Sequence, residues 1–182
     1  RKEGPILKFD ESVLFKSADV FDDALEDGGS FDNTIKTLQN SDIDVFQTSK
    51  TLAADNLREN YRRGYALLDG FRKKTMKPGD VFDIDAFARF VSVTDIFQSW
   101  HALRWHNLRF YYNPIIDRLE PILFDADRRG GSQRLHYFTR NQDEILELMF
   151  SDDEFTAKYF ARLEKLSDPD YFTEFRNDYA DE

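Results

Sequence analysis

Two short runs of alternating residues, separated by a turn, constrain the fold more than any other feature of the sequence. In residues 108–112 every second side chain is apolar, and residues 119–123 repeat this pattern. Asn113-Pro114 lies between the two runs. Alternation with a period of two is typical of strands, and Asn-Pro is typical of turns. The pattern therefore predicts an antiparallel β-hairpin.

Polar residues flank this predicted hairpin at one end. Asn107 comes just before the first strand, and Asp125 and Asp127 follow the second. Because the start of the first strand of a hairpin lies beside the end of the second, we expect these three side chains to lie close together. Ligands that are all oxygen atoms suit Mg²⁺. The sequence therefore predicts a metal site formed by Asn107, Asp125 and Asp127.

The same stretch resembles the CotH family of kinase-like proteins, which is named after spore-coat protein H. The resemblance rests on an Asn before an aromatic strand, a Tyr-Tyr-Asn-Pro turn and the run Phe-Asp-Ala-Asp at 124–127. It covers about residues 82–130, and residues 4–10 are similar to the segment that follows the first lobe in that family. The resemblance implies that Asn107 is the catalytic-loop Asn that holds Mg²⁺, and that residues 124–127 supply the metal-binding carboxylate. It also implies ATP as the nucleotide and phosphoryl transfer as the reaction.

The sequence departs from this pattern at the catalytic base. Kinase-like loops place an Asp five residues before the Asn, and here that position is Ala102. His101 is the nearest substitute, because an imidazole can accept a proton near neutral pH. A single His in an aromatic-rich helix is more often a packed structural residue, so both interpretations of His101 stay open.

The sequence also has no glycine-rich phosphate loop followed by a Lys on a strand. Gly28-Gly29 and Gly130-Gly131 lack the spacing of a phosphate-binding motif. The chain starts at Arg1 without a Met, and we expect the family's amino-terminal lobe to be missing from it. The expected result is a kinase-like lobe without catalytic activity, a pseudokinase.

Two arginines follow the predicted metal ligands directly. Arg128 and Arg129 would be placed to contact the phosphate oxygens of a nucleotide next to the metal. The alternative is that they form a solvated turn.

Composition excludes several other classes of protein. The net charge of -10 argues against a nucleic-acid partner, because phosphate backbones require clustered Lys and Arg. The absence of cysteine excludes disulfides and thiolate chemistry, and the three histidines do not have zinc-motif spacing. No apolar run is long enough to span a membrane. The compartment stays open, including secretion or display on a bacterial surface.

Helical periodicity dominates the rest of the chain. We predict one α+β domain over residues 1–182, a mostly helical, bundle-like lobe with a small antiparallel hairpin, resembling the carboxyl-terminal lobe of a kinase-like fold. Residues 1–43 are expected to be a loosely structured acidic segment with a short helix over 17–26, residues 44–130 the site-bearing core, and residues 131–182 the carboxyl-terminal helices. Within the core, long helices are predicted over 44–74 and from Asp83 or Asp85 to Leu103. A capping box at Asn141 and Glu144 is expected to begin a later helix.

Three functional interpretations remain open. The first is a CotH-type kinase lobe that holds a Mg²⁺-nucleotide. The second is a helical module that binds a protein partner, in which Asn107 and Asp125 are structural. The third is an accessory domain of a bacterial surface or secreted protein, in which exposed Trp and Tyr side chains stack on sugar rings. Only the first requires Asn107 and the aspartates to converge on one point.

Overall fold

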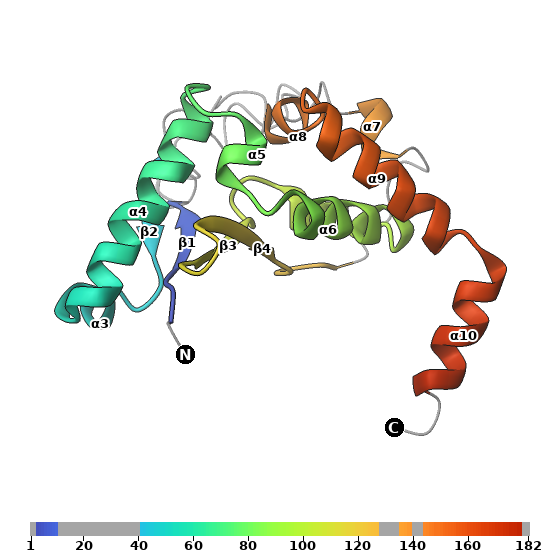
Figure 1. The fold of residues 1–182 in the computed structure, drawn as a ribbon, viewed down its shortest axis with the longest axis horizontal. Coiled ribbons are helices and arrows are strands. Elements are labelled where there is room, and N and C mark those ends of the chain that lie inside the picture. The colour runs from blue at the N-terminus through green and yellow to red at the C-terminus, as the bar shows by residue number, and fades with distance from the viewer. Residues whose placement is uncertain (1–2, 11–40, 128–134, 140–143, 180–182) are drawn as a thin grey trace, which may run out of the picture.

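The computed structural model describes residues 3–10, 41–127, 135–139 and 144–179. These residues form an α+β fold in which helices predominate and the strands form one small antiparallel sheet (Figure 1). The predicted mostly helical α+β class is therefore confirmed. The helix predicted over residues 17–26 lies outside the described residues, as do Asn141 of the predicted capping box and the pair Arg128 and Arg129.

The sheet has four strands in the order β2-β1-β3-β4. They are β1 (Ile6–Phe9), β2 (Ile43–Val45), β3 (Arg109–Asn113) and β4 (Arg118–Ile122). β3 and β4 form the predicted hairpin, with Phe110 opposite Pro121. On its other edge β3 pairs with β1, where Leu7 lies opposite Phe110. The sheet is larger than predicted because residues at both ends of the segment 1–43 join it.

One face of the sheet carries the core. Alternate residues of the strands point to this face and are buried, namely Leu7, Phe9, Ile43, Val45, Phe110, Tyr112 and Leu119. Helix α4 (Asp55–Arg72) packs against all four strands. Gly64 permits the close approach, because a Cβ atom there would lie 3.0 Å from Leu7 Cδ1 and 3.2 Å from Tyr112 Cβ. The alternation in the hairpin thus orients its apolar side chains toward α4.

The single long helix predicted over 44–74 is wrong. The structure replaces it with β2, helix α3 (Thr48–Ala53) and helix α4. Ile43 and Val45 alternate with Asp44 and pair with Phe9 and Leu7 across the sheet, so burial of this face overrides helical propensity. Two breaks follow, since Gln47 has a left-handed backbone with φ of 53° and Ala54 is extended.

The second predicted helix begins as expected and ends early. Helix α6 (Ile84–Ile96) is capped by Asp83, whose carboxylate accepts the Ala86 N–H at 3.0 Å. Gln98, with φ of 54°, interrupts the helix before Leu103. A separate 3₁₀ helix, η1 (Trp100–Leu103), follows and leads to the start of β3. This break places the residues of η1 beside the end of the hairpin.

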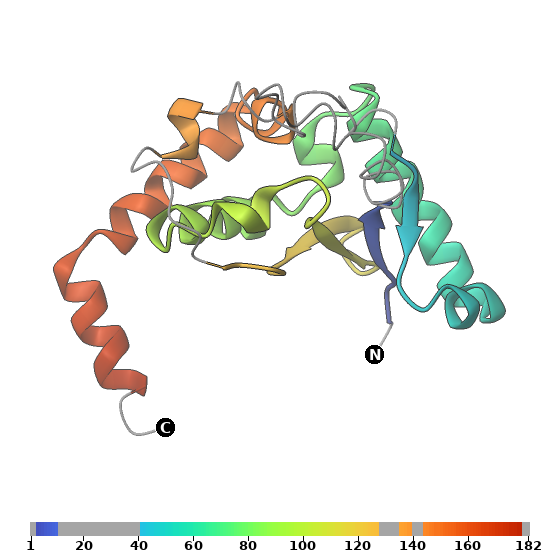
Figure 2. The same ribbon diagram turned by 180° about the vertical axis from the view of Figure 1, so that it is seen from behind.

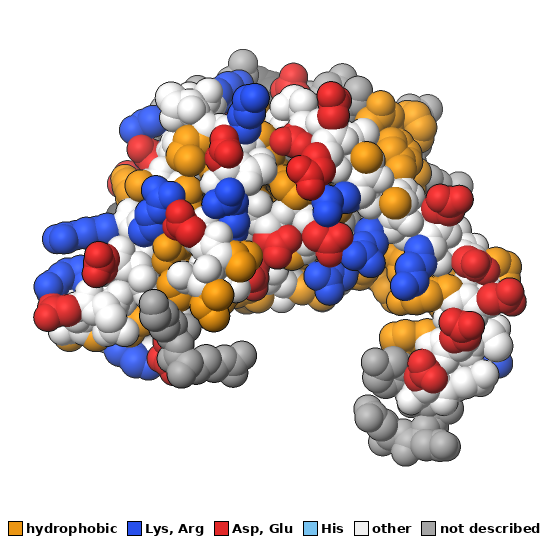
Figure 3. Space-filling model, viewed as in Figure 1, with side chains coloured by type: hydrophobic (Ala, Val, Ile, Leu, Met, Phe, Trp, Pro, Cys, Tyr) orange, Lys and Arg blue, Asp and Glu red, His pale blue; other side chains and the backbone are white. Residues whose placement is uncertain are grey.

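The remaining helices come directly before α6 or after the hairpin in the chain. Helix α5 (Pro78–Val81) precedes α6, and α7 (His136–Thr139), α8 (Glu144–Met149) and α9 (Asp153–Leu166) follow the hairpin. Helix α9 packs along α6, and α10 (Pro169–Tyr179) extends away from the body (Figures 1 and 2). Apolar side chains are visible on the surface of this end of the molecule (Figure 3). None of the helices in the described ranges is both long and apolar enough to cross a membrane.

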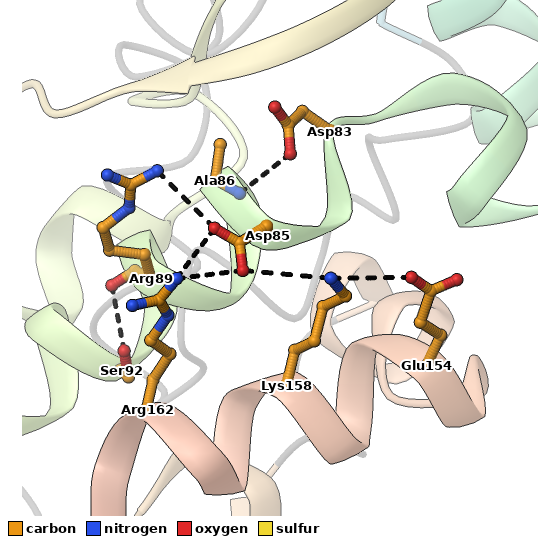
Figure 4. A network of polar contacts seen from close by, with 8 residues as sticks. All are labelled: Asp83, Asp85, Ala86, Arg89, Ser92, Glu154, Lys158 and Arg162. Atoms are coloured by element: carbon orange, nitrogen blue, oxygen red, sulfur yellow. Dashed lines mark hydrogen bonds and ion pairs between the residues drawn. The ribbon is translucent and has the colours of Figure 1, made fainter. Parts of the chain in front are cut away.

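A polar network joins α6 to α9 (Figure 4). Arg162 of α9 donates to both carboxylate oxygens of Asp85, at 3.0 and 2.9 Å. Lys158 lies 3.9 Å from Asp85 and 3.7 Å from Glu154, and Arg89 lies 3.8 Å from Asp85. The hydrogen bond from Arg162 is the main cause that lowers the pKa of Asp85 below its ordinary value.

We expect Asp85→Asn to lower the free energy of unfolding at neutral pH by less than about 1 kcal/mol, because the network is partly exposed. A lowered pKa in the folded state means that the carboxylate stabilises the fold above the ordinary value of 3.8 and loses this effect as the pH falls. The variant and the parent should therefore converge in stability in strong acid. Urea unfolding of both proteins across this pH range measures the difference, and a gap that stays constant with pH would contradict the electrostatic origin.

Candidate functional site

Three of the residues predicted to form a site, His101, Asn107 and Asp125, lie at one end of the hairpin. η1 carries His101, a turn places Asn107 two residues before β3, and Asp125 follows the end of β4 by three residues. The turn is held by the backbone N–H groups of Asn107 and Leu108, which both donate to the carbonyl of Arg104 at 2.8 and 3.1 Å. Strand pairing and the turn together bring three segments to this end of the sheet.

His101 lies between the other two side chains. Its Nδ1 atom is 2.9 Å from Asn107 Nδ2 and 3.0 Å from Asp125 Oδ2. The amide of Asn107 also donates to the backbone carbonyl of His101, at 3.0 Å. Asn107 and Asp125 therefore converge on one nitrogen atom, and we call these three residues the His101 cluster.

The His101 cluster is largely shielded from solvent. Asn107 is buried, and the side chains of His101 and Asp125 are 15% and 30% exposed. Asp125 has a left-handed backbone with φ of 48°, which is uncommon for a residue other than glycine. Such conformations persist where the surrounding structure fixes them, and they concentrate at functional sites. The backbone at Asp125 directs its carboxylate to His101.

A buried arginine supports the segment that carries Asn107. Arg109 Nη1 donates to the backbone carbonyls of His106 and Leu108, at 2.6 and 3.1 Å. Its guanidinium lies over the rings of Phe124 and Phe46, with distances of 4.5 and 5.8 Å to the ring centroids. Because Phe124 directly precedes Asp125, Arg109 links the two chain segments that meet at the His101 cluster.

Asp127, the third predicted metal ligand, is exposed. Arg128 and Arg129, which were predicted to contact phosphate oxygens, lie outside the described residues. In the described parts of the chain, no three side chains among His, Asp and Glu gather as a metal-binding group. The donors brought together are thus one imidazole, one amide and one carboxylate. This set can bind a divalent cation, although it contains a nitrogen atom where oxygen alone was expected.

A second polar cluster, formed by Asp95, His136 and Tyr159, was not predicted from the sequence. The side chain of Asp95 is only 2% exposed, and its oxygens accept the backbone N–H of His136 at 3.1 and 3.3 Å. The Tyr159 hydroxyl donates to Asp95 at 2.5 Å, and His136 Nδ1 also contacts this carboxylate. Burial, followed by the hydrogen bond to Asp95, raises the pKa of Tyr159. The sequence contains a signal for this cluster, because Asp95 lies one helical turn after the buried Val91 on the apolar face of α6.

Comparison with known proteins adds no relative to this description. No family model, curated protein or solved structure gives a significant match to the chain.

Proposed function

We propose that the His101 cluster is the metal-binding half of a kinase-like nucleotide site of the CotH type. The observation that supports the proposal is the convergence of Asn107 and Asp125, which are 18 positions apart in the sequence, on a single nitrogen atom of His101. A structural role for either residue alone does not require this convergence. The resemblance of residues 107–127 to the catalytic loop and metal-binding run of that family gives the cluster its chemical identity.

In this proposal Asn107 and Asp125 hold the cation. When bound, the nucleotide would supply the phosphoryl group, and Mg²⁺ would supply the positive charge that offsets the negative phosphate oxygens. In the observed arrangement the Asn107 amide donates to the backbone carbonyl of His101. The Asp125 carboxylate lies 3.0 Å from Nδ1 of the imidazole. In this proposal these residues bind the cation and position the loop. Neither Asn107 nor Asp125 is at the sequence position where the family has its catalytic base.

His101 is poorly placed to replace that base. To accept a proton at Nε2, the imidazole would carry its hydrogen on Nδ1 and donate it to Asp125. The Nδ2 group of Asn107 lies 2.9 Å from the same Nδ1 atom, and in this orientation it also donates to the carbonyl of His101. Two hydrogens would then face each other, which opposes this tautomer. We therefore propose binding without phosphoryl transfer.

The test is a calorimetric titration of the whole chain with Mg²⁺. We expect affinity in the millimolar range that disappears in the double variant Asp125→Ala, Asp127→Ala, and no transfer of phosphate from labelled ATP. The single variants separate the two carboxylates: Asp125→Ala should lose the binding, while Asp127→Ala should retain most of it. Binding that survives the double substitution, or robust autophosphorylation, would contradict the proposal.

Exposed aromatic side chains favour a second candidate, a module that binds a protein partner. Four phenylalanines on α7, α9 and α10 are between 39% and 64% exposed: Phe138, Phe160, Phe172 and Phe175. Their helices lie at the end of the molecule where apolar side chains are visible on the surface (Figures 1 and 3). Patches of this kind often mark protein interfaces. This candidate makes no demand on the His101 cluster, so absence of cation binding by the parent protein would favour it.

A further inference from the structure

The His101 Nδ1 atom has two neighbours with incompatible requirements. If Nδ1 carries no hydrogen, it accepts from Asn107, but its lone pair then faces a carboxylate oxygen of Asp125 at 3.0 Å. If Nδ1 carries a hydrogen, it donates to Asp125, but that hydrogen then faces the amide hydrogens of Asn107. An imidazole nitrogen has one bonding direction in its ring plane and serves one partner. A cation bound by Nδ1 and Asp125 would remove the repulsion between these two atoms.

The polar atoms around Nδ1 lie close to one another. Asp125 Oδ2 is 3.0 Å and Asn107 Nδ2 is 2.9 Å from Nδ1, which are the distances of hydrogen-bonded neighbours. Ligands of one cation with bonds of about 2.1 Å lie about 3.0 to 3.3 Å apart, whether the site is octahedral or tetrahedral. The three side chains are therefore close enough to bind one cation together.

We infer that His101 is a ligand through Nδ1, and that it directs this site to a first-row transition metal such as Co²⁺ or Fe²⁺ in preference to Mg²⁺. The inference rests on the proposed function and specifies its cation. Mg²⁺ favours oxygen ligands, whereas imidazole suits transition metals, whose affinity for nitrogen donors rises across the series from Mn²⁺ to Cu²⁺. One imidazole in place of an oxygen ligand thus shifts the selectivity of the site.

Binding requires a defined change at Asn107. Its amide now presents Nδ2 to the cluster and must turn by half a rotation to present Oδ1, the atom that can bind a cation. The turn breaks the hydrogen bond to the backbone carbonyl of His101. Metal binding should therefore move the side-chain amide resonances of Asn107, and this effect is a readout independent of catalysis.

The experiment compares Co²⁺ with Mg²⁺ by calorimetric titration of the whole chain. We expect Co²⁺ to bind at least about tenfold more tightly than Mg²⁺. Nuclear magnetic resonance of the Co²⁺ complex should also show paramagnetically shifted resonances of a coordinated imidazole. In His101→Asn, which keeps a polar atom near the position of Nδ1 but offers oxygen, Co²⁺ affinity should fall about tenfold while Mg²⁺ affinity stays within about twofold.

His106→Asn is the matched control. His106 is in the same segment, and its ring centroid lies 6.0 Å from that of His101. The control should keep the preference for Co²⁺. Circular dichroism and thermal unfolding of both variants show whether they keep the parent fold. Asp125→Asn removes the carboxylate and so tests the second proposed ligand of the same site.

The outcomes separate the inference from the proposed function. Equal affinity for the two metals, unchanged in His101→Asn but lost in Asp125→Asn, would overturn the role of His101 and leave the metal site standing. Co²⁺ binding that survives Asp125→Asn would place the metal elsewhere and overturn both. Absence of binding by either metal at millimolar concentrations would also overturn both.

Discussion

Replacing Phe87 by alanine should lower the free energy of unfolding by about 3–5 kcal/mol. Phe87 is fully buried on α6, and its ring lies 5.0 to 6.2 Å, centroid to centroid, from four other rings. Two of these, Phe110 of β3 and Phe155 of α9, belong to the elements on opposite sides of α6. The side chain therefore joins the sheet to the carboxyl-terminal helices, and its removal leaves a cavity that neither side can fill without moving.

The matched control for this prediction is Phe97→Ala. Phe97 follows α6 directly and is 60% exposed, so the same chemical deletion there should change the free energy of unfolding by less than about 0.5 kcal/mol. Denaturant unfolding followed by fluorescence and circular dichroism measures both variants. Similar losses at the two positions would show that Phe87 does not connect the two layers as the packing implies.

The hairpin was predictable because its information is local. The alternation in residues 108–112 and 119–123 and the intervening Asn113-Pro114 are visible within sixteen residues, and β3 and β4 follow them closely. Strand β2 was not predictable in the same way. Ile43 and Val45 become strand residues through pairing with Phe9 and Leu7, which are more than thirty positions away in the sequence. Only that pairing buries them, whereas helical spacing alone placed Val45 in a long helix and left Ile43 in the loosely structured segment before it.

The candidate site, too, was predictable where its information is local in the sequence and not predictable elsewhere. The positions of Asn107 and Asp125 follow from the geometry of any hairpin, so the sequence predicts that they lie at one end. The place of His101 depends on the break at Gln98 and on the orientation of η1, neither of which has a clear signal in the sequence. The sequence therefore predicted that Asn107 and Asp125 lie close together, but it did not predict that an imidazole would lie between them.

The buried carboxylate of Asp95 gives the second large effect. We expect Asp95→Ala to lower the free energy of unfolding by about 3 kcal/mol, a value typical of removing one partner from a buried polar pair. The Tyr159 hydroxyl and the His136 N–H would lose their acceptor, and the buried Tyr159 hydroxyl would be left without a hydrogen-bond partner from Asp95. Asp95→Asn keeps the shape of the side chain, but its amide N–H groups would face the donors that the carboxylate now accepts from. We therefore expect a smaller loss in the free energy of unfolding, of about 1–3 kcal/mol.

A double-mutant cycle with Tyr159→Phe tests whether the hydroxyl and the carboxylate act together. Tyr159→Phe keeps the ring, which packs against Phe150 and Phe155, and removes only the group that donates to Asp95. In the background of Asp95→Ala the hydroxyl has already lost this acceptor, so its removal should cost less there than in the parent protein, or even stabilise the fold. Strictly additive losses in urea unfolding would mean that the two groups stabilise the protein independently. A coupling of about 1 kcal/mol or more would instead show that the hydrogen bond from Tyr159 to the buried Asp95 carboxylate stabilises the contact between α9 and α6, in addition to aromatic packing.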